Sequence, residues 1–389
     1  MKVLVGLEKR FSVTPDGTIW SQGWLDANFW DRYLDEFESV EVFARVLPVD
    51  SPPPRSRVAS RPEVTFLDVP FYKGPWQYAR NIGRLRRAAA TAISNADAIV
   101  CRAPGGMSSL LYRAARRARM PFGVEVVGDP YDVFDPKAMK NALRPFLRFW
   151  VTRELRQMCQ NAAAVSYVTS ASLQQRYPAG EGSFSTSYSS INLDDIDFVA
   201  GPRTTFSPDH RILFIGSLAQ LYKAPDVLLE AFSLVRQEMP ASLTLIGDGA
   251  YRPHLEAMAK SLGIDADVTF RGVLPAGEAI RNALDDCDLF VLPSHTEGLP
   301  RVMIEAMARA APCIGTSISG ILELLPNDLC VAPGDSQALA RKICNVLRDR
   351  DGLAQLSARN FEEASQYHIR HLRPKRRSFL SVLKAGCRK

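Results

Sequence analysis

The chain has 389 residues, of which 46% are hydrophobic and 23% are charged. This composition is typical of a folded soluble protein and excludes a disordered one, and the length favours two domains. No apolar run approaches the roughly 18–20 residues that a membrane-spanning helix needs. The first apolar run, in residues 3–7, is too short for a signal peptide and predicts a first strand.

The cysteines and histidines predict neither disulfides nor a metal site. Seven cysteines are scattered along the chain, form no Cys-x-x-Cys pair, and do not cluster with the five histidines. An odd number of dispersed cysteines is typical of reduced thiols in a cytoplasmic protein. We therefore expect a cytoplasmic protein without a metal ion.

The net charge of +6 is concentrated in the first half of the chain. Residues 71–160 hold 16 Lys and Arg against 6 Asp and Glu, a balance of +10. Several of these arginines alternate with the aromatic residues Phe146, Phe149 and Trp150. This pattern suits helices lying on an anionic membrane surface, but solvated helix faces would look the same. Nucleic-acid binding is disfavoured because no recognition motif accompanies the charge.

The first half of the chain alternates predicted strands with predicted helices, which indicates a parallel sheet with helices on both faces. The predicted strands are Lys2–Leu7, Ser39–Val46, Val64–Leu67, Ala98–Cys101, Phe122–Val127 and Ala164–Val168. The predicted helices are Trp24–Phe37, Gln77–Asn95 and Ser108–Arg119. The prolines in residues 51–54 and the polar residues after them predict an extended loop.

A second alternating series begins near residue 209, after a polar stretch, Phe184–Pro208, that we interpret as a linker. Its predicted strands are Arg211–Ile215, Ser242–Ile246, Val268–Phe270, Leu289–Leu292 and Cys313–Gly315. Its predicted helices are Pro225–Glu238, Tyr251–Leu262, Ala276–Asp285, Pro300–Arg309 and Ser336–Arg348, and a basic helical tail starts at Ala364. Two doubly wound units would bind a ligand between them, at the carboxyl ends of their strands.

Three segments that follow predicted strands have the composition of ligand-binding turns. Gly216 opens a loop that reaches Lys223, a residue able to neutralise a phosphate. Gly247-Asp-Gly249 lacks the third glycine of a dinucleotide fingerprint, so tight turning is its simpler interpretation. The segment that ends at Val273 and Leu274 could hydrogen-bond a flat base edge through its backbone.

The stretch from Pro293 to Ala308 holds two glutamates, Glu297 and Glu305, in a turn followed by a helix. Gly298 allows close approach of backbone to a ligand, and Pro300 can occupy the first turn of a helix without losing a hydrogen bond. A helix N-terminus presents unpaired N–H groups and a positive dipole end, which suits a diphosphate. Either glutamate alone could be a solvated surface residue.

Taken together, these residues resemble the donor domain of the retaining glycosyltransferases of family 4, which have the GT-B fold. The matching segments span roughly residues 209–345 and are Gly216…Lys223, Gly247-Asp-Gly249, Phe270-Arg-Gly-Val-Leu274, Asp288-Leu-Phe-Val-Leu-Pro-Ser294 and Glu297-Gly-Leu-Pro300…Glu305-Ala-Met-Ala308. The resemblance implies an α/β protein of two facing doubly wound Rossmann-like domains. We expect an acceptor-binding domain over residues 1–200, a donor-binding domain over 205–365, and a helical tail over 366–389 that could return to the first domain.

The resemblance also implies a role for each matching residue. Lys223 would bind the donor diphosphate, Glu297 the transferred sugar, and Glu305 the ribose hydroxyls. Backbone near Gly298, Leu299 and Pro300 would hold sugar or phosphate, and backbone near Val273 and Leu274 would bind the nucleobase. The expected donor-binding set is completed by the loop residues Gly216, Ser217 and Gly247.

The chain departs from the family pattern at two places. Ser217 stands where the family often has an arginine. The stretch Gly123–Asp132 lacks the histidine that the family often has there, and we take Asp129 as the candidate substrate-contacting residue in its place. An aspartate in Gly-Asp-Pro is also a common turn former, so both interpretations of Asp129 stay open.

The predicted function is transfer of a sugar from a nucleotide-diphosphate sugar to an acceptor hydroxyl, with retention of configuration and without a metal or other cofactor. The acceptor would be a lipid-linked or growing polysaccharide, and the basic first domain would hold the enzyme at the inner face of the membrane. A nicotinamide-dependent oxidoreductase is an alternative, but a complete Gly-x-Gly-x-x-Gly is missing. A non-catalytic sugar-binding protein of two domains is the other, although such proteins are more usually exported.

Overall fold

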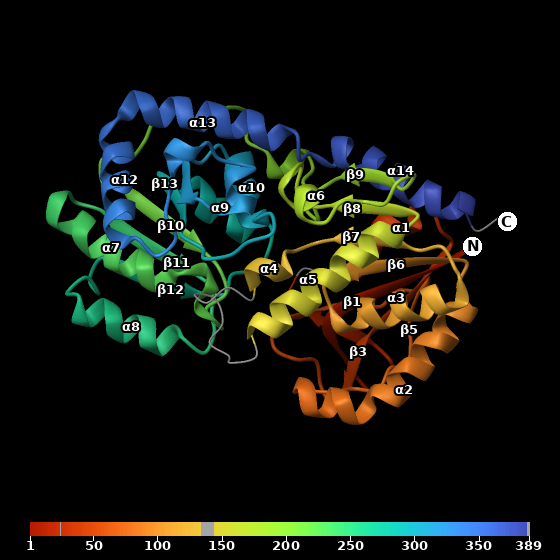
Figure 1. Cartoon of the computed structure of the whole chain (residues 1–389). Coiled ribbons are helices and arrows are strands. Elements are labelled where there is room, and N and C mark those ends of the chain that lie inside the picture. The colour runs from red at the N-terminus through yellow and green to blue at the C-terminus, as the bar shows by residue number, and fades with distance from the viewer. Residues whose placement is uncertain (24, 134–143, 387–389) are drawn as a thin grey trace. The chain divides into compact units, whose positions relative to one another are not determined.

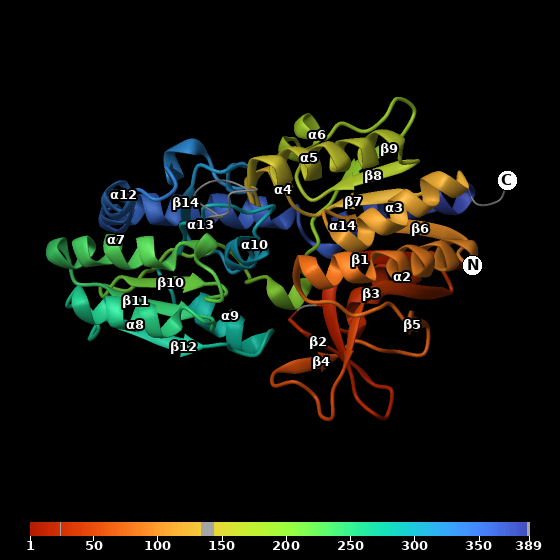
Figure 2. The same cartoon turned by 60° about the horizontal axis from the view of Figure 1, so that its bottom comes forward.

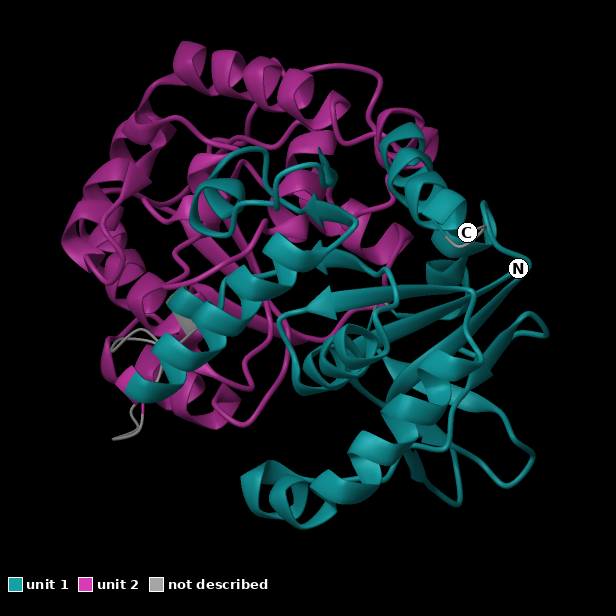
Figure 3. Cartoon of the chain, turned by 45° about the vertical axis from the view of Figure 1, so that its right-hand side comes forward, with its two compact units in different colours: residues 1–131, 146–188, 373–389 teal, residues 132–145, 189–372 magenta. Residues whose placement is uncertain are grey.

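The computed structural model describes residues 1–23, 25–133 and 144–386. The chain divides into two compact units, which are coloured separately in Figure 3. Unit 1 comprises residues 1–131, 146–188 and 373–389, and unit 2 comprises residues 132–145 and 189–372. Residues 373–386 are thus part of the same unit as the N-terminus.

Unit 1 is built on a nine-stranded sheet whose parallel core has the order β5-β3-β1-β6-β7-β8-β9. Its strands are β1 (Lys2–Val13), β2 (Ile19–Gln22), β3 (Ser39–Pro48), β4 (Ser56–Val58), β5 (Val64–Phe66), β6 (Ala98–Ala103), β7 (Gly123–Val126), β8 (Ala164–Tyr167) and β9 (Phe184–Ser187). The apolar runs of β1, β6 and β7 are buried, as expected for strands with helices on both faces. Strands β2 and β4 extend the sheet antiparallel beyond the end of β1 (Figure 2).

The helices that lie wholly or partly in unit 1 cover its sheet. They are η1 (Ala27–Trp30), α1 (Asp31–Leu34), α2 (Gly74–Ser94), α3 (Gly106–Ala118), α4 (Pro130–Val133), α5 (Arg144–Asn161), α6 (Ser172–Arg176) and α14 (Ile369–Gly386). Helices α2, α3 and α5 lie side by side on one face (Figure 1). Helix α14 packs against β7, where a Cβ atom on Gly123 would lie 2.6 Å from Leu383 and 2.8 Å from Phe379.

Unit 2 is built on six parallel strands in the order β12-β11-β10-β13-β14-β15. The strands are β10 (Arg211–Ile215), β11 (Ser242–Ile246), β12 (Val268–Gly272), β13 (Leu289–Leu292), β14 (Cys313–Thr316) and β15 (Cys330–Val331). Read in chain order, this is the 3-2-1-4-5-6 arrangement of a Rossmann fold, whose strand order reverses between β10 and β13. Ligands of such sheets bind outside the carboxyl ends of the strands at that point.

The helices of unit 2 flank this sheet and connect its parallel strands. They are η2 (Asp195–Asp197), η3 (Leu221–Lys223), α7 (Pro225–Glu238), α8 (Arg252–Ser261), α9 (Glu278–Asp285), α10 (Arg301–Ala308), α11 (Ser319–Leu322), η4 (Asn327–Leu329), α12 (Ser336–Arg348) and α13 (Arg350–Ser365). Helix α7 lies beside α8 and α12, and α10 lies beside α13 (Figure 1). Helix α10 starts directly after the loop that follows β13, so its N-terminus lies beside the reversal point.

The predicted fold class, two doubly wound α/β units, is confirmed. Several predicted elements are wrong in detail. The expected helix 24–37 is only a short 3-10 turn and one helical turn, η1 and α1, and its first residue, Trp24, lies outside the described residues. The loop after residue 54 contains β4, and the presumed linker begins with β9, because both segments complete the edges of the sheet.

Among the described residues, no helix is long and apolar enough to cross a membrane.

Candidate active site in unit 2

Glycines bring the loops after β10 and β11 into direct contact. The backbone of Gly247 has φ +144°, and a Cβ atom there would lie 1.8 Å from the carbonyl oxygen of Gly216. A Cβ atom on Gly249 would lie 2.0 Å from the amide nitrogen of Ala219. The Leu218 N–H donates to the Asp248 carbonyl at 3.0 Å, and the Tyr251 N–H donates to the Leu218 carbonyl at 3.0 Å. The predicted tight turn at Gly247-Asp-Gly249 thus fixes the Gly216 loop above the sheet.

Lys223 and Glu297 form an ion pair across the reversal point of the sheet. Lys223 ends the loop after β10, and Glu297 lies in the loop after β13, 74 residues further along the chain. The Nζ atom of Lys223 lies 2.5 Å from Oε1 of Glu297. The two side chains are 13% and 12% exposed, so the pair is largely withdrawn from water. The stem of Lys223 passes over Gly216, where a Cβ atom would lie 2.5 Å from Lys223 Cδ.

Hydrogen bonds from neighbouring strands hold the Glu297 loop. The Ser294 hydroxyl donates to Glu297 Oε1 at 3.0 Å, and the Thr316 hydroxyl donates to the Ser294 carbonyl at 2.6 Å. The His295 N–H donates to the Tyr222 carbonyl at 2.8 Å, which ties this loop to the one that carries Lys223. Burial raises the pKa of the Tyr222 hydroxyl. The matching motif includes Ser294, but nothing in the sequence assigns it a role, because its partner follows only from the loop geometry.

Helix α10 begins one residue later than expected. Pro300 is the N-cap residue, with extended backbone at φ −73° and ψ 103°, and Arg301 is the first helical residue. The Pro300 carbonyl accepts from the Met303 N–H at 3.1 Å. Gly298, two residues before Pro300, lies in a loop that packs closely on α11. A Cβ atom on Gly320 of that helix would lie 1.7 Å from the Gly298 carbonyl oxygen. Leu299, between Gly298 and Pro300, is buried. The first N–H groups of α10 lack partners within the helix and lie just after this loop.

Glu305 lies one turn into α10 and is half-buried. Burial raises the pKa of its carboxyl group, and the positive charge of Arg301 partly offsets this. Raised carboxyl pKa values are common at functional sites, although structural groups show them as well.

Three further predicted contact residues lie on neighbouring loops. Val273 and Leu274 follow β12 directly, and Val273 is 44% exposed. The turn before them needs glycine, since Gly272 has φ +67° and its carbonyl accepts from the Gly247 N–H at 2.8 Å. Ser217 is exposed, and its hydroxyl accepts from the Ala219 N–H at 3.3 Å.

Asp129 belongs to unit 1, and its carboxylate is occupied by local partners. It accepts hydrogen bonds from the Tyr177 hydroxyl at 2.6 Å and from the Tyr131 N–H at 2.9 Å, and it forms an ion pair with Arg176. The bond to Tyr131, two residues on, is the turn-forming contact expected of an aspartate. Its contact with substrate stays a prediction.

The strand order defines unit 2 as a Rossmann-like domain, and the glycine-shaped loops and the Lys223–Glu297 pair lie at the point where that order reverses. Residues 209–349 match the family model described as glycosyl transferases group 1. The chain is 23% identical to protein CapJ of Staphylococcus aureus over 90% of this chain and 88% of CapJ. It is 37% identical to the amylovoran biosynthesis glycosyltransferase AmsK of Erwinia amylovora, over 34% of this chain and 35% of AmsK.

The fold also matches a solved structure over nearly its whole length. The crystal structure of HepE from Anabaena, in complex with UDP and glucose, covers 98% of this chain and 100% of its own, with a TM-score of 0.68 and 18% identity. The two Rossmann-like units are therefore those of the GT-B fold. Residues 209–349 therefore resemble a group 1 glycosyl transferase domain, within a chain that shares the fold of the solved structure over nearly its whole length.

Proposed function

We propose that the protein is a retaining, metal-independent glycosyltransferase that uses a nucleotide-diphosphate sugar. The observation that carries the proposal is the Lys223–Glu297 pair at the point where the strand order reverses. An ammonium group can neutralise a leaving diphosphate, and a carboxylate accepts hydrogen bonds from sugar hydroxyls. The pair would hold both groups in place before the donor arrives.

The other contacts follow from the order of the loops along the sheet. Backbone around Gly298–Pro300 and the N-terminus of α10 would receive phosphate or sugar. The Glu305 carboxylate would accept from the ribose hydroxyls, and the backbone at Val273 and Leu274 would contact the nucleobase. Asp129 is kept as a candidate contact for the substrate in unit 1.

The chemistry proposed is front-face transfer. With Glu305 assigned to the ribose, no second carboxylate is assigned as a nucleophile of the kind that retaining hydrolases use. The acceptor hydroxyl would attack on the face from which the diphosphate departs, and a diphosphate oxygen would take its proton. Lys223 and the α10 terminus would stabilise the charge that develops on the diphosphate.

The proposed acceptor is a lipid-linked or growing polysaccharide in the assembly of a cell-surface glycan. The match to AmsK, named for amylovoran biosynthesis, supports this class of acceptor. The balance of +10 in residues 71–160 supports a peripheral enzyme at the anionic inner face of the membrane.

The test is donor turnover by the purified protein with a panel of nucleotide-diphosphate sugars and glycan-lipid acceptors. We expect release of nucleoside diphosphate that depends on acceptor, persists with EDTA, and gives a product with the donor's anomeric configuration. Glu297→Gln should abolish release, whereas Glu230→Gln, an exposed glutamate on α7, should not. Full turnover by Glu297→Gln would overturn the assignment of the site.

A further inference from the structure

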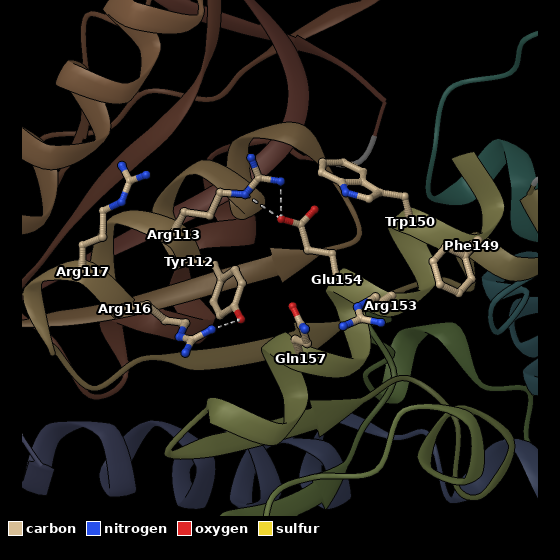
Figure 4. A pocket seen from close by; sticks show the side chains of 9 residues that line it. All are labelled: Tyr112, Arg113, Arg116, Arg117, Phe149, Trp150, Arg153, Glu154 and Gln157. Carbon is tan, nitrogen blue, oxygen red and sulfur yellow. Dashed lines mark hydrogen bonds and ion pairs between the residues drawn. The ribbon is translucent and has the colours of Figure 1, made fainter. Parts of the chain in front are cut away.

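A groove of about 560 Å³ lies between α3 and α5 in unit 1 (Figure 4), and none of its lining residues belongs to the candidate donor site. It is lined by Tyr112, Arg113, Arg116, Arg117, Phe149, Trp150, Arg153, Glu154 and Gln157. The lining positions on each helix are spaced by about one turn, so each helix turns one continuous face toward the groove. The volume is in the range of sites for small ligands.

One arginine and one glutamate form the framework of the groove. Arg113 on α3 reaches Glu154 on α5, with Nη2 2.7 Å and Nε 2.8 Å from Oε1. The Ser109 hydroxyl donates to the other carboxylate oxygen at 3.0 Å, and Glu154 is buried. The guanidinium of Arg113 lies 5.0 Å from the ring centre of Trp150. These contacts fix the spacing of the two helices and position Trp150 at the groove.

The remaining arginines of the groove add positive charge to its lining. In the described ranges, Arg113 is the one groove arginine with an ion pair. Arg116 donates a hydrogen bond to the Tyr112 hydroxyl at 3.3 Å, and Arg117 and Arg153 are exposed. Four arginines thus face one glutamate. Several like charges that line one groove raise its positive potential, which favours binding of an anion there.

The basic surface continues on both sides of the groove. Arg113 and Arg117 also line a hollow of about 450 Å³ toward α2, together with Arg86. Arg116 lines a third hollow of about 370 Å³ with Arg119. On α5, Phe149 is 64% exposed and Trp150 is 45% exposed. The groove therefore combines several arginine side chains with two large aromatic side chains that are partly exposed to solvent.

We propose that this groove binds the phosphate group of an anionic membrane lipid. A guanidinium can donate two parallel hydrogen bonds to a phosphate, and Trp and Phe side chains contribute apolar area at the boundary between headgroups and lipid chains. The inference rests on the membrane part of the proposed function and makes it specific: Arg116 and Arg117 bind the phosphate, and Phe149 and Trp150 contact the lipid beside it.

The test is co-flotation of the full chain with vesicles of phosphatidylcholine with and without phosphatidylglycerol. We expect binding to the anionic vesicles alone. Arg116→Gln/Arg117→Gln should weaken this binding at least about tenfold. The matched control Lys260→Gln/Arg341→Gln removes two charges from exposed helix positions of unit 2 and should bind as the wild type does. Melting curves establish that each variant is folded.

Two further measurements distinguish a specific phosphate-binding site from nonspecific electrostatic attraction to the membrane. Arg116→Lys/Arg117→Lys keeps the charge and removes the planar forks, so we expect an intermediate loss. If this variant binds as well as the wild type, the groove is not a phosphate-binding site. The same conclusion follows if the groove variant and the control variant lose equal binding. Either result would leave the proposal of membrane attachment unaffected. Displacement of the protein from vesicles by soluble glycerol phosphate at equal phosphate concentration would show a free phosphate ligand and overturn the lipid assignment.

If the wild-type protein does not bind anionic vesicles, both the lipid site in the groove and membrane attachment are overturned. Sugar transfer to a water-soluble acceptor, measured in the same preparations, reports separately on the transferase proposal.

Discussion

Glu297 Oε1 accepts from two donors at once, Lys223 Nζ at 2.5 Å and Ser294 Oγ at 3.0 Å, and these donors come from the loops after β10 and β13. The carboxylate is therefore fixed by both strands that flank the reversal point. A group held in this way loses little freedom when a ligand binds, which is the general advantage of a preorganised site.

The Lys223–Glu297 pair should be coupled in stability. Glu297→Gln or Lys223→Gln alone leaves the partner charge largely buried and unpaired, and we expect each to lower the free energy of unfolding by about 1–3 kcal/mol. The double variant should lose less than the sum of the two. Urea unfolding of the four proteins measures the coupling, and strictly additive losses would contradict it.

Gly247 should not tolerate a side chain. In Gly247→Ala the new Cβ atom would meet the Gly216 carbonyl oxygen, so the Gly216 loop would have to move and carry Lys223 with it. We expect a loss of about 3 kcal/mol or more in unfolding free energy, together with weaker binding of nucleoside diphosphate.

Gly83→Ala is the matched control for Gly247→Ala. Gly83 lies inside α2, and a Cβ atom added there would have no other atom within 4 Å beyond its own helix backbone and chain neighbours. An alanine in a helix interior is favoured over glycine by roughly 0.5–1 kcal/mol, so this variant should gain stability. Thermal unfolding and nucleotide titration of both variants check the contrast, and equal behaviour would be evidence against close loop packing.

Glu305 should make stability and donor binding depend on pH in opposite directions. Because burial raises its carboxyl pKa in the folded state, the folded protein binds a proton more tightly than the unfolded chain does. The stability that this proton provides is present at low pH and is lost as the pH rises through the folded pKa. Donor binding, for which we propose that the ionised carboxylate is needed, should instead weaken as the pH falls, starting at a higher pH than for an ordinary glutamate.

Glu305→Gln removes both effects. Relative to the wild type, we expect it to be more stable at neutral pH by about 0.5–2 kcal/mol, to lose this advantage in acid, and to bind donor poorly at every pH. Unfolding at several pH values and donor titration measure the two quantities. A variant that is less stable than the wild type at neutral pH would show that the ionised carboxylate has a partner in the folded protein.

Asp129→Asn should lower the stability of unit 1 by about 1–3 kcal/mol, because it weakens the contacts with Arg176 and Tyr177. The role in substrate contact is tested separately, by kcat and KM at a temperature where the variant is fully folded. Unchanged kinetic constants there would leave Asp129 with its local structural contacts alone.

The sequence predicts the parallel core of both sheets well and their edges poorly. Buried strands such as Leu289–Leu292 are continuous apolar runs between polar turns, and periodicity finds them. Strands β4 and β9 are short, polar and at sheet edges, so their formation depends on a neighbouring strand rather than on their own residues. The site shows the same division, since motifs identify Lys223 and Glu297 individually, whereas their contact, and the part that Ser294 plays in it, depend on loop geometry.

Helix α14 has a consequence for how this protein is made. Its residues Phe379 and Leu383 fill the face of β7 at Gly123, and Arg373 and Arg377 pair with Asp35 and Glu36 near the start of the chain. During synthesis, the N-terminal sheet therefore leaves the ribosome long before the segment that covers this face. Unit 2 can finish folding first, although it is translated later, and a recombinant fragment ending near residue 188 would expose an apolar surface and tend to aggregate.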